Sequence, residues 1–199
     1  MSALSRRDFL AVTTAATAAS VLPAGSAALA AAPAATSQVP SAYRYKVGDA
    51  EVTVVSDGIR TIPLGDTFVR NQPREAVNGA LKAAYLPENQ VTINFNVLLV
   101  NTGGKLIVID TGNGPAQGTV GLTQGTLKAI GVDPKNVDAV VISHFHGDHI
   151  NGLVTAEGTP AYPNAQVMVP DAEWAFWMDD GNMSRAPDAQ KGGFQNARR

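Results

Sequence analysis

The seven residues Ser143-His144-Phe145-His146-Gly147-Asp148-His149 constrain this chain more than any other stretch, because they contain all three of its histidines. They follow residues 137–142, an apolar run with the sequence Val-Asp-Ala-Val-Val-Ile. A short continuous apolar run of this kind is typical of a strand buried on both faces. We therefore predict a central strand that delivers the cluster to the edge of a sheet, where loops commonly carry function.

The spacing within this cluster indicates metal binding. His144 and His146 are two residues apart, so in an extended segment both imidazoles project to one side and can bind the same ion. Gly147 permits a turn, after which Asp148 and His149 diverge from the first pair and suit a second ion. Paired ions about 3.5 to 4 Å apart can activate water for attack on a substrate. Nitrogen and carboxylate ligands without thiolate favour Zn²⁺, with Mn²⁺, Fe²⁺ or Co²⁺ as alternatives.

The His-x-His-x-Asp-His pattern of these four residues resembles the metallo-β-lactamase-fold hydrolases. Upstream, residues 96–100 and 105–112 are similar to two strands of that family and to its Asp-Thr-Gly turn. Gly152 resembles the family's glycine that lets the segment after the metal loop approach the site. Residues 57–71 and 162–177 look most like secreted hydrolases of the methyl parathion hydrolase type, with quorum-signal lactonases close behind.

The resemblance implies an α/β (α+β) chain with the metallo-β-lactamase αββα sandwich, of which residues 43–178 match only the N-terminal half. In the family, the later half supplies a third histidine to the first metal, and a bridging aspartate and a last histidine to the second. No histidine follows His149 here. The resemblance therefore leaves the first metal with His144 and His146 and the second with Asp148 and His149. We expect a truncated gene product, a fragment, or a protein that uses the same loop differently.

Asp110 ends a predicted strand and precedes Thr111 and Gly112. A carboxylate at this position can accept the free N–H of a metal-bound histidine, which fixes the ring and raises its basicity. Alternatively, Asp110 only caps the turn. The residues alone favour neither role, and the family resemblance favours the first.

Other patterns predict regular structure along most of the chain. Asp57-Gly58 is read as a two-residue hairpin turn that starts a new strand. Trp174 and Trp177 lie three residues apart in a predicted helix and are assigned to core packing rather than to a pocket wall. The expected strands are 43–47, 51–55, 59–62, 91–100, 106–110 and 166–169, and the expected helices are 73–85, 122–130 and 170–178.

The N-terminus has the features of an export signal. Residues 5–10, Ser-Arg-Arg-Asp-Phe-Leu, have the twin-arginine form and precede an Ala- and Thr-rich stretch with a small-x-small site at 28–30. We predict a removable twin-arginine signal at 1–30 rather than a membrane anchor or a plain surface helix, hence a periplasmic or secreted protein. The expected organisation continues with a disordered linker at 31–42, a folded domain at 43–183 and an irregular tail at 184–199.

Charge and cysteine content narrow the classes of partner. The whole chain has a formal net charge of −2. Residues 1–30 carry +1, from Arg6, Arg7 and Asp8, so the remaining residues carry −3. This charge disfavours a nucleic-acid partner. The chain has no cysteine, so neither a disulfide nor a thiolate ligand is available.

Together with the resemblance, these features predict an exported metal-dependent hydrolase. A metal-bound hydroxide would attack a small neutral ester, lactone or phosphotriester, and Asp148 would orient that nucleophile while ligating. The alternatives are a β-lactamase, a tRNA-maturing endonuclease of the same fold, and an inactive, weakly metal-binding fragment. The last, which folds only as an oligomer or scarcely at all, is the expectation for the isolated 199-residue chain. The expected partner is a small molecule, with no nucleic acid and no stable membrane anchor, and self-association into a homo-oligomer is left open.

Overall fold

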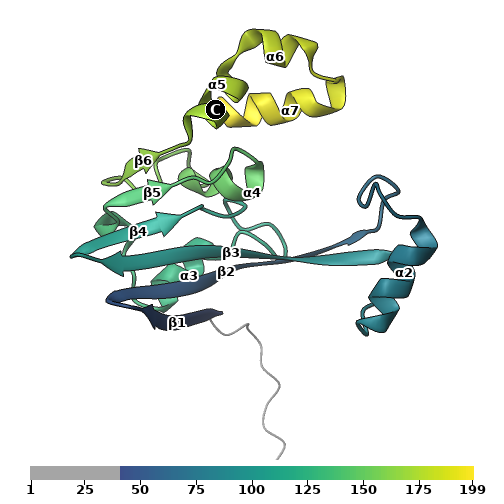
Figure 1. Cartoon of the computed structure of the whole chain (residues 1–199). Helices are drawn as coiled ribbons and strands as arrows, with labels where there is room; N and C mark the ends of the chain where they lie inside the picture. Colours follow the sequence, from purple (N-terminus) through teal and green to yellow (C-terminus); the bar gives the residue numbers. More distant parts are fainter. Residues whose placement is uncertain (1–40) are drawn as a thin grey trace, which may run out of the picture. The chain divides into compact units, whose positions relative to one another are not determined.

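The computed structural model describes residues 41–199, so the predicted export signal and residues 31–40 of the predicted linker lie outside the described part. Its centre is one six-stranded sheet in the order β1-β2-β3-β4-β5-β6 (Figure 1). The strands are β1 (Ala42–Val47), β2 (Ala50–Pro63), β3 (Gln90–Thr102), β4 (Lys105–Ile109), β5 (Ala139–Val141) and β6 (Gln166–Met168). The predicted strands on either side of Gly48-Asp49 and of Gly103-Gly104 pair antiparallel, so each of these dipeptides forms the turn of a hairpin.

The sheet changes from antiparallel to parallel at β4. Strands β1 to β4 pair antiparallel, whereas β5 pairs parallel with both β4 and β6. Parallel neighbours end at the same edge of a sheet, so the residues that follow β4 and β5 meet there. The Asp110 N–H donates to the Val141 carbonyl at 2.8 Å, which closes this edge.

The helices are α2 (Arg74–Ala83), α3 (Thr123–Ala129), α4 (Gly147–Ile150), α5 (Asp171–Met178), α6 (Asp180–Arg185) and α7 (Asp188–Ala197), with 3-10 turns η1 (Pro134–Asn136) and η2 (Asn151–Leu153). The helices predicted at 73–85, 122–130 and 170–178 are confirmed as α2, α3 and α5. None of the helices in residues 41–199 combines the length and apolar character that crossing a bilayer requires.

Three sequence predictions are wrong in the C-terminal and N-terminal segments. The predicted irregular tail at 184–199 is helical, since it contains the end of α6 and all of α7. Trp174 is 56% exposed rather than packed in the core, whereas Trp177 packs against the core. The first strand starts at Ala42, which the sequence assigned to the linker.

The predicted turn at Asp57-Gly58 is also wrong, because β2 runs through it without reversing. The pairing of β2 with β3 shifts register between Ser56 and Gly58, which marks a β-bulge. Gly58 has φ +110°, and a Cβ there would lie 1.9 Å from the Thr119 carbonyl oxygen. A glycine with positive φ suits a bulge as well as a turn, so the dipeptide alone could not distinguish the two.

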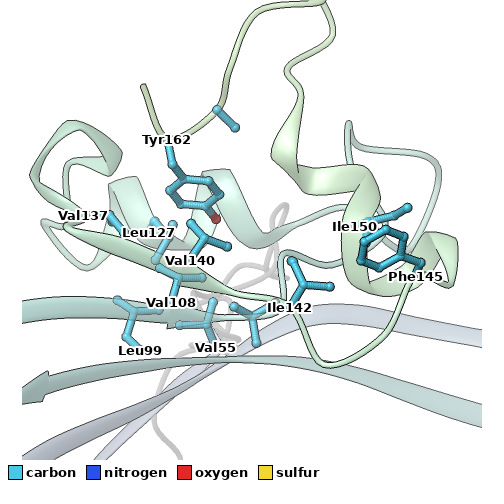
Figure 2. Close-up of a cluster of buried hydrophobic side chains, with 12 residues drawn as sticks. Val55, Leu99, Val108, Leu127, Val137, Val140, Ile142, Phe145, Ile150 and Tyr162 are labelled. Atoms are coloured by element: carbon cyan, nitrogen blue, oxygen red, sulfur yellow. The ribbon is translucent and has the colours of Figure 1, made fainter. Parts of the chain in front are cut away.

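One face of the sheet is buried under α3 and the loops around β5. Val55, Val108 and Val140 lie in this core, together with Leu127 of α3 (Figure 2). Val97 belongs to the same cluster. The chain that follows β5 contributes side chains to the same cluster: Ile142, Phe145, Ile150 and Tyr162. The histidine loop is therefore anchored in the core by residues that flank its histidines.

The opposite face of the sheet is apolar as well. The strand register aligns one row across it, which runs Tyr43, Val54, Leu98, Ile109, Val141 and Met168. Its central members are half-buried, while Tyr43 and Met168 at the two ends are 71% and 49% exposed.

Candidate metal centre

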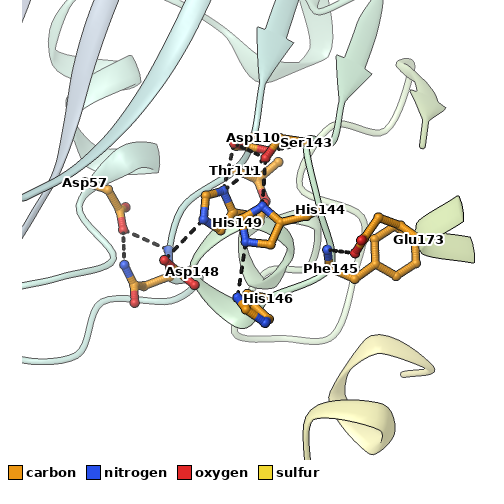
Figure 3. A network of polar contacts seen from close by, with 11 residues as sticks. Asp57, Asp110, Thr111, Ser143, His144, Phe145, His146, Asp148, His149 and Glu173 are labelled. Carbon is orange, nitrogen blue, oxygen red and sulfur yellow. Dashed lines mark hydrogen bonds and ion pairs between the residues drawn. The ribbon is translucent and has the colours of Figure 1, made fainter. Parts of the chain in front are cut away.

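The two histidines that the sequence predicts on one side of an extended segment are brought together. His146 has an extended backbone, with φ −71° and ψ 152°, and it precedes the first residue of α4. His144 Nε2 lies 3.2 Å from His146 Nδ1 (Figure 3). Two nitrogens that share a tetrahedral zinc at about 2.0–2.1 Å are about 3.3 Å apart, so this pair has the separation of two ligands on one ion.

The second predicted pair lies in the first turn of α4. His149 Nε2 is 3.3 Å from Asp148 Oδ2, again the separation expected for two ligands of one ion. The ring centroids of His144 and His149 are 3.9 Å apart, so the two pairs are adjacent. Within residues 41–199, no three or more His, Cys, Asp or Glu side chains converge on one point, so each donor pair contributes two ligands.

Asp110 makes the contact that the resemblance implies for it. Its Oδ2 accepts the Nδ1–H of His149 at 2.8 Å, which directs Nε2 of that ring toward Asp148. Thr111 holds the main chain of His149. Both the N–H and the hydroxyl of Thr111 donate to the His149 carbonyl, at 2.8 and 2.7 Å. The Asp-Thr-Gly turn thus fixes the ring and the main chain of His149 together.

Ser143 extends this arrangement to His144. Its hydroxyl donates to Asp110 Oδ2 at 2.8 Å and lies 3.1 Å from His144 Nδ1, while its N–H donates to Asp110 Oδ1 at 2.7 Å. Asp110 has φ +59°, a strained conformation for a residue with a Cβ, and these contacts hold it there. The sequence assigned Ser143 no role, because a serine beside a histidine is not informative without the three-dimensional contact.

Burial lowers the pKa of the His144 imidazole below its usual range, and the neighbouring His149 and His146 lower it further. A neutral imidazole keeps the lone pair that a metal ion requires. The donor chemistry and the two spacings therefore suit two protein ligands for each of two metal ions, one fewer than the three protein ligands of a usual catalytic zinc.

Asp57 is a structural determinant of the site that the sequence analysis missed. Its buried carboxylate, 0% exposed, accepts five hydrogen bonds. The donors and distances are Asn113 N (2.8 Å), Asn113 Nδ2 (2.9 Å), Gly121 N (3.3 Å), Thr123 N (3.0 Å) and Thr123 Oγ1 (2.6 Å). These bonds join the β2 bulge to the loop that contains Asp110 and to the start of α3. The available signal was a carboxylate followed by glycine inside a β-branched run, which also indicates a bulge.

Gly152 lies against the Asp-Thr-Gly turn, as its resemblance implied. A Cβ on Gly152 would be 2.0 Å from the Thr111 carbonyl oxygen, a backbone atom held by the contacts described above. We expect Gly152→Ala to lower the free energy of unfolding by about 1–3 kcal/mol, the usual range for overpacking. Chemical unfolding followed by circular dichroism measures this change.

The matched control is Gly79→Ala, in the exposed middle of α2, where nothing lies within 4 Å of the added Cβ. It is expected to stabilise the chain by up to about 1 kcal/mol through helix propensity. Equal stability of Gly152→Ala and wild type would show that the turn can move away from η2 at no cost.

Comparisons with known proteins bear on the family and the fold of this chain. The family model described as Metallo-beta-lactamase superfamily matches residues 94–193. The crystal structure of the hydrolase AbOPH, in the beta lactamase superfamily, is 31% identical with a TM-score of 0.73 and covers 81% of this chain. AidC, a dizinc quorum-quenching lactonase, is 22% identical with a TM-score of 0.69 over 80% of this chain, a likeness of fold alone.

A third similarity is confined to a short stretch. A ribonuclease Z from Clostridium kluyveri is 37% identical over 60 residues, or 30% of this chain. The chain spans 17% of that ribonuclease, 57% of the AbOPH chain and 59% of the AidC chain.

Proposed function

Because this chain belongs to the metallo-β-lactamase superfamily, we propose that its histidine loop is the metal-binding part of the active site of a zinc-dependent hydrolase. The observation that carries this proposal is the pairing of donors at ligand spacing, 3.2 Å for His144 with His146 and 3.3 Å for Asp148 with His149. The methyl parathion hydrolase and lactonase type is the branch that we favour. The 31% identity to the hydrolase AbOPH supports this choice.

In this proposal His144 Nε2 and His146 Nδ1 hold one zinc ion, and Asp148 and His149 Nε2 hold the second. When bound, the two ions would supply an activated water and polarise the substrate's carbonyl or phosphoryl oxygen. Asp148 orients the attacking water through its carboxylate. By accepting a hydrogen bond, Asp110 keeps the proton of His149 on Nδ1. The Ser143 hydroxyl lies beside Nδ1 of His144 and keeps the proton of that ring on Nδ1 in the same way.

The proposed substrate is a small uncharged ester, lactone or phosphotriester. The net charge of −3 outside the first thirty residues would not attract an anionic polymer, which supports a neutral small molecule. We further propose that the protein acts outside the cytoplasm after twin-arginine export. We also propose that it self-associates, which would bury apolar surface that a single copy leaves exposed.

Zinc removal and restoration test this function. We expect purified, zinc-loaded protein to hydrolyse at least one of an aryl ester, an acyl lactone and an aryl phosphotriester, to lose this activity with a chelator and to regain it with Zn²⁺. Zinc at about 100 times its Kd should also stabilise the fold by about 2.7 kcal/mol, because binding favours the native state. Hydrolysis that is unchanged after chelation, or an absence of zinc-induced stabilisation, would contradict the proposal.

A nuclease is the second candidate, favoured by the 60-residue similarity to ribonuclease Z. A nuclease would cleave a precursor tRNA and would show steep salt dependence, because phosphate contacts release counterions. Assaying precursor tRNA with the same zinc-loaded sample separates the two candidates. Cleavage of tRNA without turnover of the three small substrates would replace the first candidate by the second.

A further inference from the structure

Glu173 of α5 contacts the backbone between the two histidines of the first donor pair. Its Oε2 accepts the N–H of Phe145 at 2.9 Å (Figure 3). Phe145 lies directly between His144 and His146, and its side chain is buried in the core with 5% exposure. The backbone of the loop is thus held on one side by the core and on the other by this carboxylate.

The carboxylate is itself held in position. Trp177 lies one helical turn beyond Glu173, and its indole N–H donates to the same Oε2 at 2.9 Å. The N–H of Phe145 holds the pKa of the Glu173 carboxyl below its usual range, with a further contribution from the indole. An ionised acceptor with two donors makes stronger hydrogen bonds than a neutral one.

The same helix also contacts the second histidine of the pair. The Trp177 ring meets the His146 ring edge-on at 6.1 Å between centroids. Behind it, Phe194 of α7 packs on Trp177 at 4.7 Å, and the Arg198 Nε–H donates to the Trp177 carbonyl at 2.8 Å. The segment that the sequence predicted as an irregular tail therefore packs against α5.

A second attachment joins α7 to the far end of the loop. The Asn196 amide donates to Asn151 Oδ1 at 2.7 Å, and the Asn151 side chain lies against Gly147, the first residue of α4. Residues 173–196 thus contact the loop at both its start and its end.

We propose that Glu173 is a positioning residue for the metal pair His144 and His146. Its carboxylate holds the Phe145 N–H, and with it the loop, so that the two histidine nitrogens stand at ligand spacing before an ion arrives. A loop already in this geometry loses less conformational entropy when it binds a metal than a free one does. The proposal rests on the proposed function only in taking this pair as metal ligands.

Cobalt titration of the full chain tests this role, since Co²⁺ occupies zinc sites and its visible absorption reports ligand geometry. We expect Glu173→Ala to weaken Co²⁺ binding by about 10- to 100-fold, the usual effect of removing a group that orients a ligand. Glu173→Gln keeps an oxygen acceptor for the Phe145 N–H and should restore most of this loss. Asp171→Ala removes an equal charge from the start of the same helix and should bind Co²⁺ as the wild type does.

A purely structural role would give a different pattern. Glu173→Ala would then unfold at a lower temperature, but its folded fraction would bind Co²⁺ with the affinity and spectrum of the wild type. That result, or equal Co²⁺ affinities of Glu173→Ala and Asp171→Ala, would overturn the positioning role alone. A wild type that binds no Co²⁺ would instead overturn the proposed function, and this role with it.

Discussion

His146→Ala is expected to lose metal and hydrolytic activity together, each by more than about 100-fold, the upper end for residues that only orient a ligand. His146 Nδ1 is one of the two nitrogens that lie 3.2 Å apart. Without it, the first ion would keep a single protein ligand from this chain, His144, whereas catalytic zinc sites usually have three. Metal content by mass spectrometry and initial rates on the most active of the three small substrates measure both losses on one sample.

The fold itself should survive this substitution. The His146 side chain is exposed, so its removal opens no cavity, and the metal-free variant should unfold within about 0.5 kcal/mol of metal-free wild type. Glu157→Ala, at another exposed position, is the control and should keep both metal and activity. A metal-replete His146→Ala protein with full activity would remove the hydrolase proposal.

Asp57→Ala is expected to reduce the free energy of unfolding by several kcal/mol, because each buried donor left without an acceptor costs about 1–3 kcal/mol. Five donors on three residues, Asn113, Gly121 and Thr123, would lose their acceptor inside the protein. Since single domains are stable by only about 5–15 kcal/mol, this loss is a large share of the total. Urea unfolding, followed by circular dichroism in metal-free buffer, measures it.

The comparison for Asp57→Ala is again Glu157→Ala, which removes an exposed carboxylate and should change stability by less than about 0.5 kcal/mol. Asp57→Asn should fall between the two, because its one amide oxygen can accept only part of the set and its NH₂ group faces donors. If Asp57→Ala proved as stable as Glu157→Ala, the carboxylate would have no structural role in joining the three segments.

The sequence predicted those parts of the fold and site that depend on neighbours along the chain. The paired strands β3 and β4 are joined by Gly103-Gly104, and α5 begins after Pro170, so each carries its own turn or start signal. The histidine loop belongs to this class, since its four candidate donors lie within six residues. The contact between Asp110 and His149 depends in addition on the parallel pairing of β4 with β5. The family resemblance, rather than a local pattern, predicted this contact.

The remaining features depend on contacts between distant segments. The helix α7 contains Gly192-Gly193 and reads as irregular by propensity, yet Phe194 packs on Phe176 and Trp177, and this tertiary contact outweighs the local preference. Glu173 lies 28 residues from its partner Phe145, and Asp57 lies more than 50 residues from each of its partners. The local pattern at Asp57-Gly58 could indicate a bulge, but no local pattern shows which distant donors either carboxylate accepts from.

The second apolar face of the sheet makes the stability of this fold conditional on its surroundings. Its aligned row of Tyr43, Val54, Leu98, Ile109, Val141 and Met168 gains hydrophobic free energy only when something excludes water from it. Each 100 Å² of apolar surface covered is worth about 2.5 kcal/mol, comparable to a single buried side chain. A molecule that covers this face binds the native state and not the unfolded one, so it shifts the folding equilibrium by mass action. The melting temperature of this chain therefore depends on which molecules in the solution cover this face, as well as on the sequence.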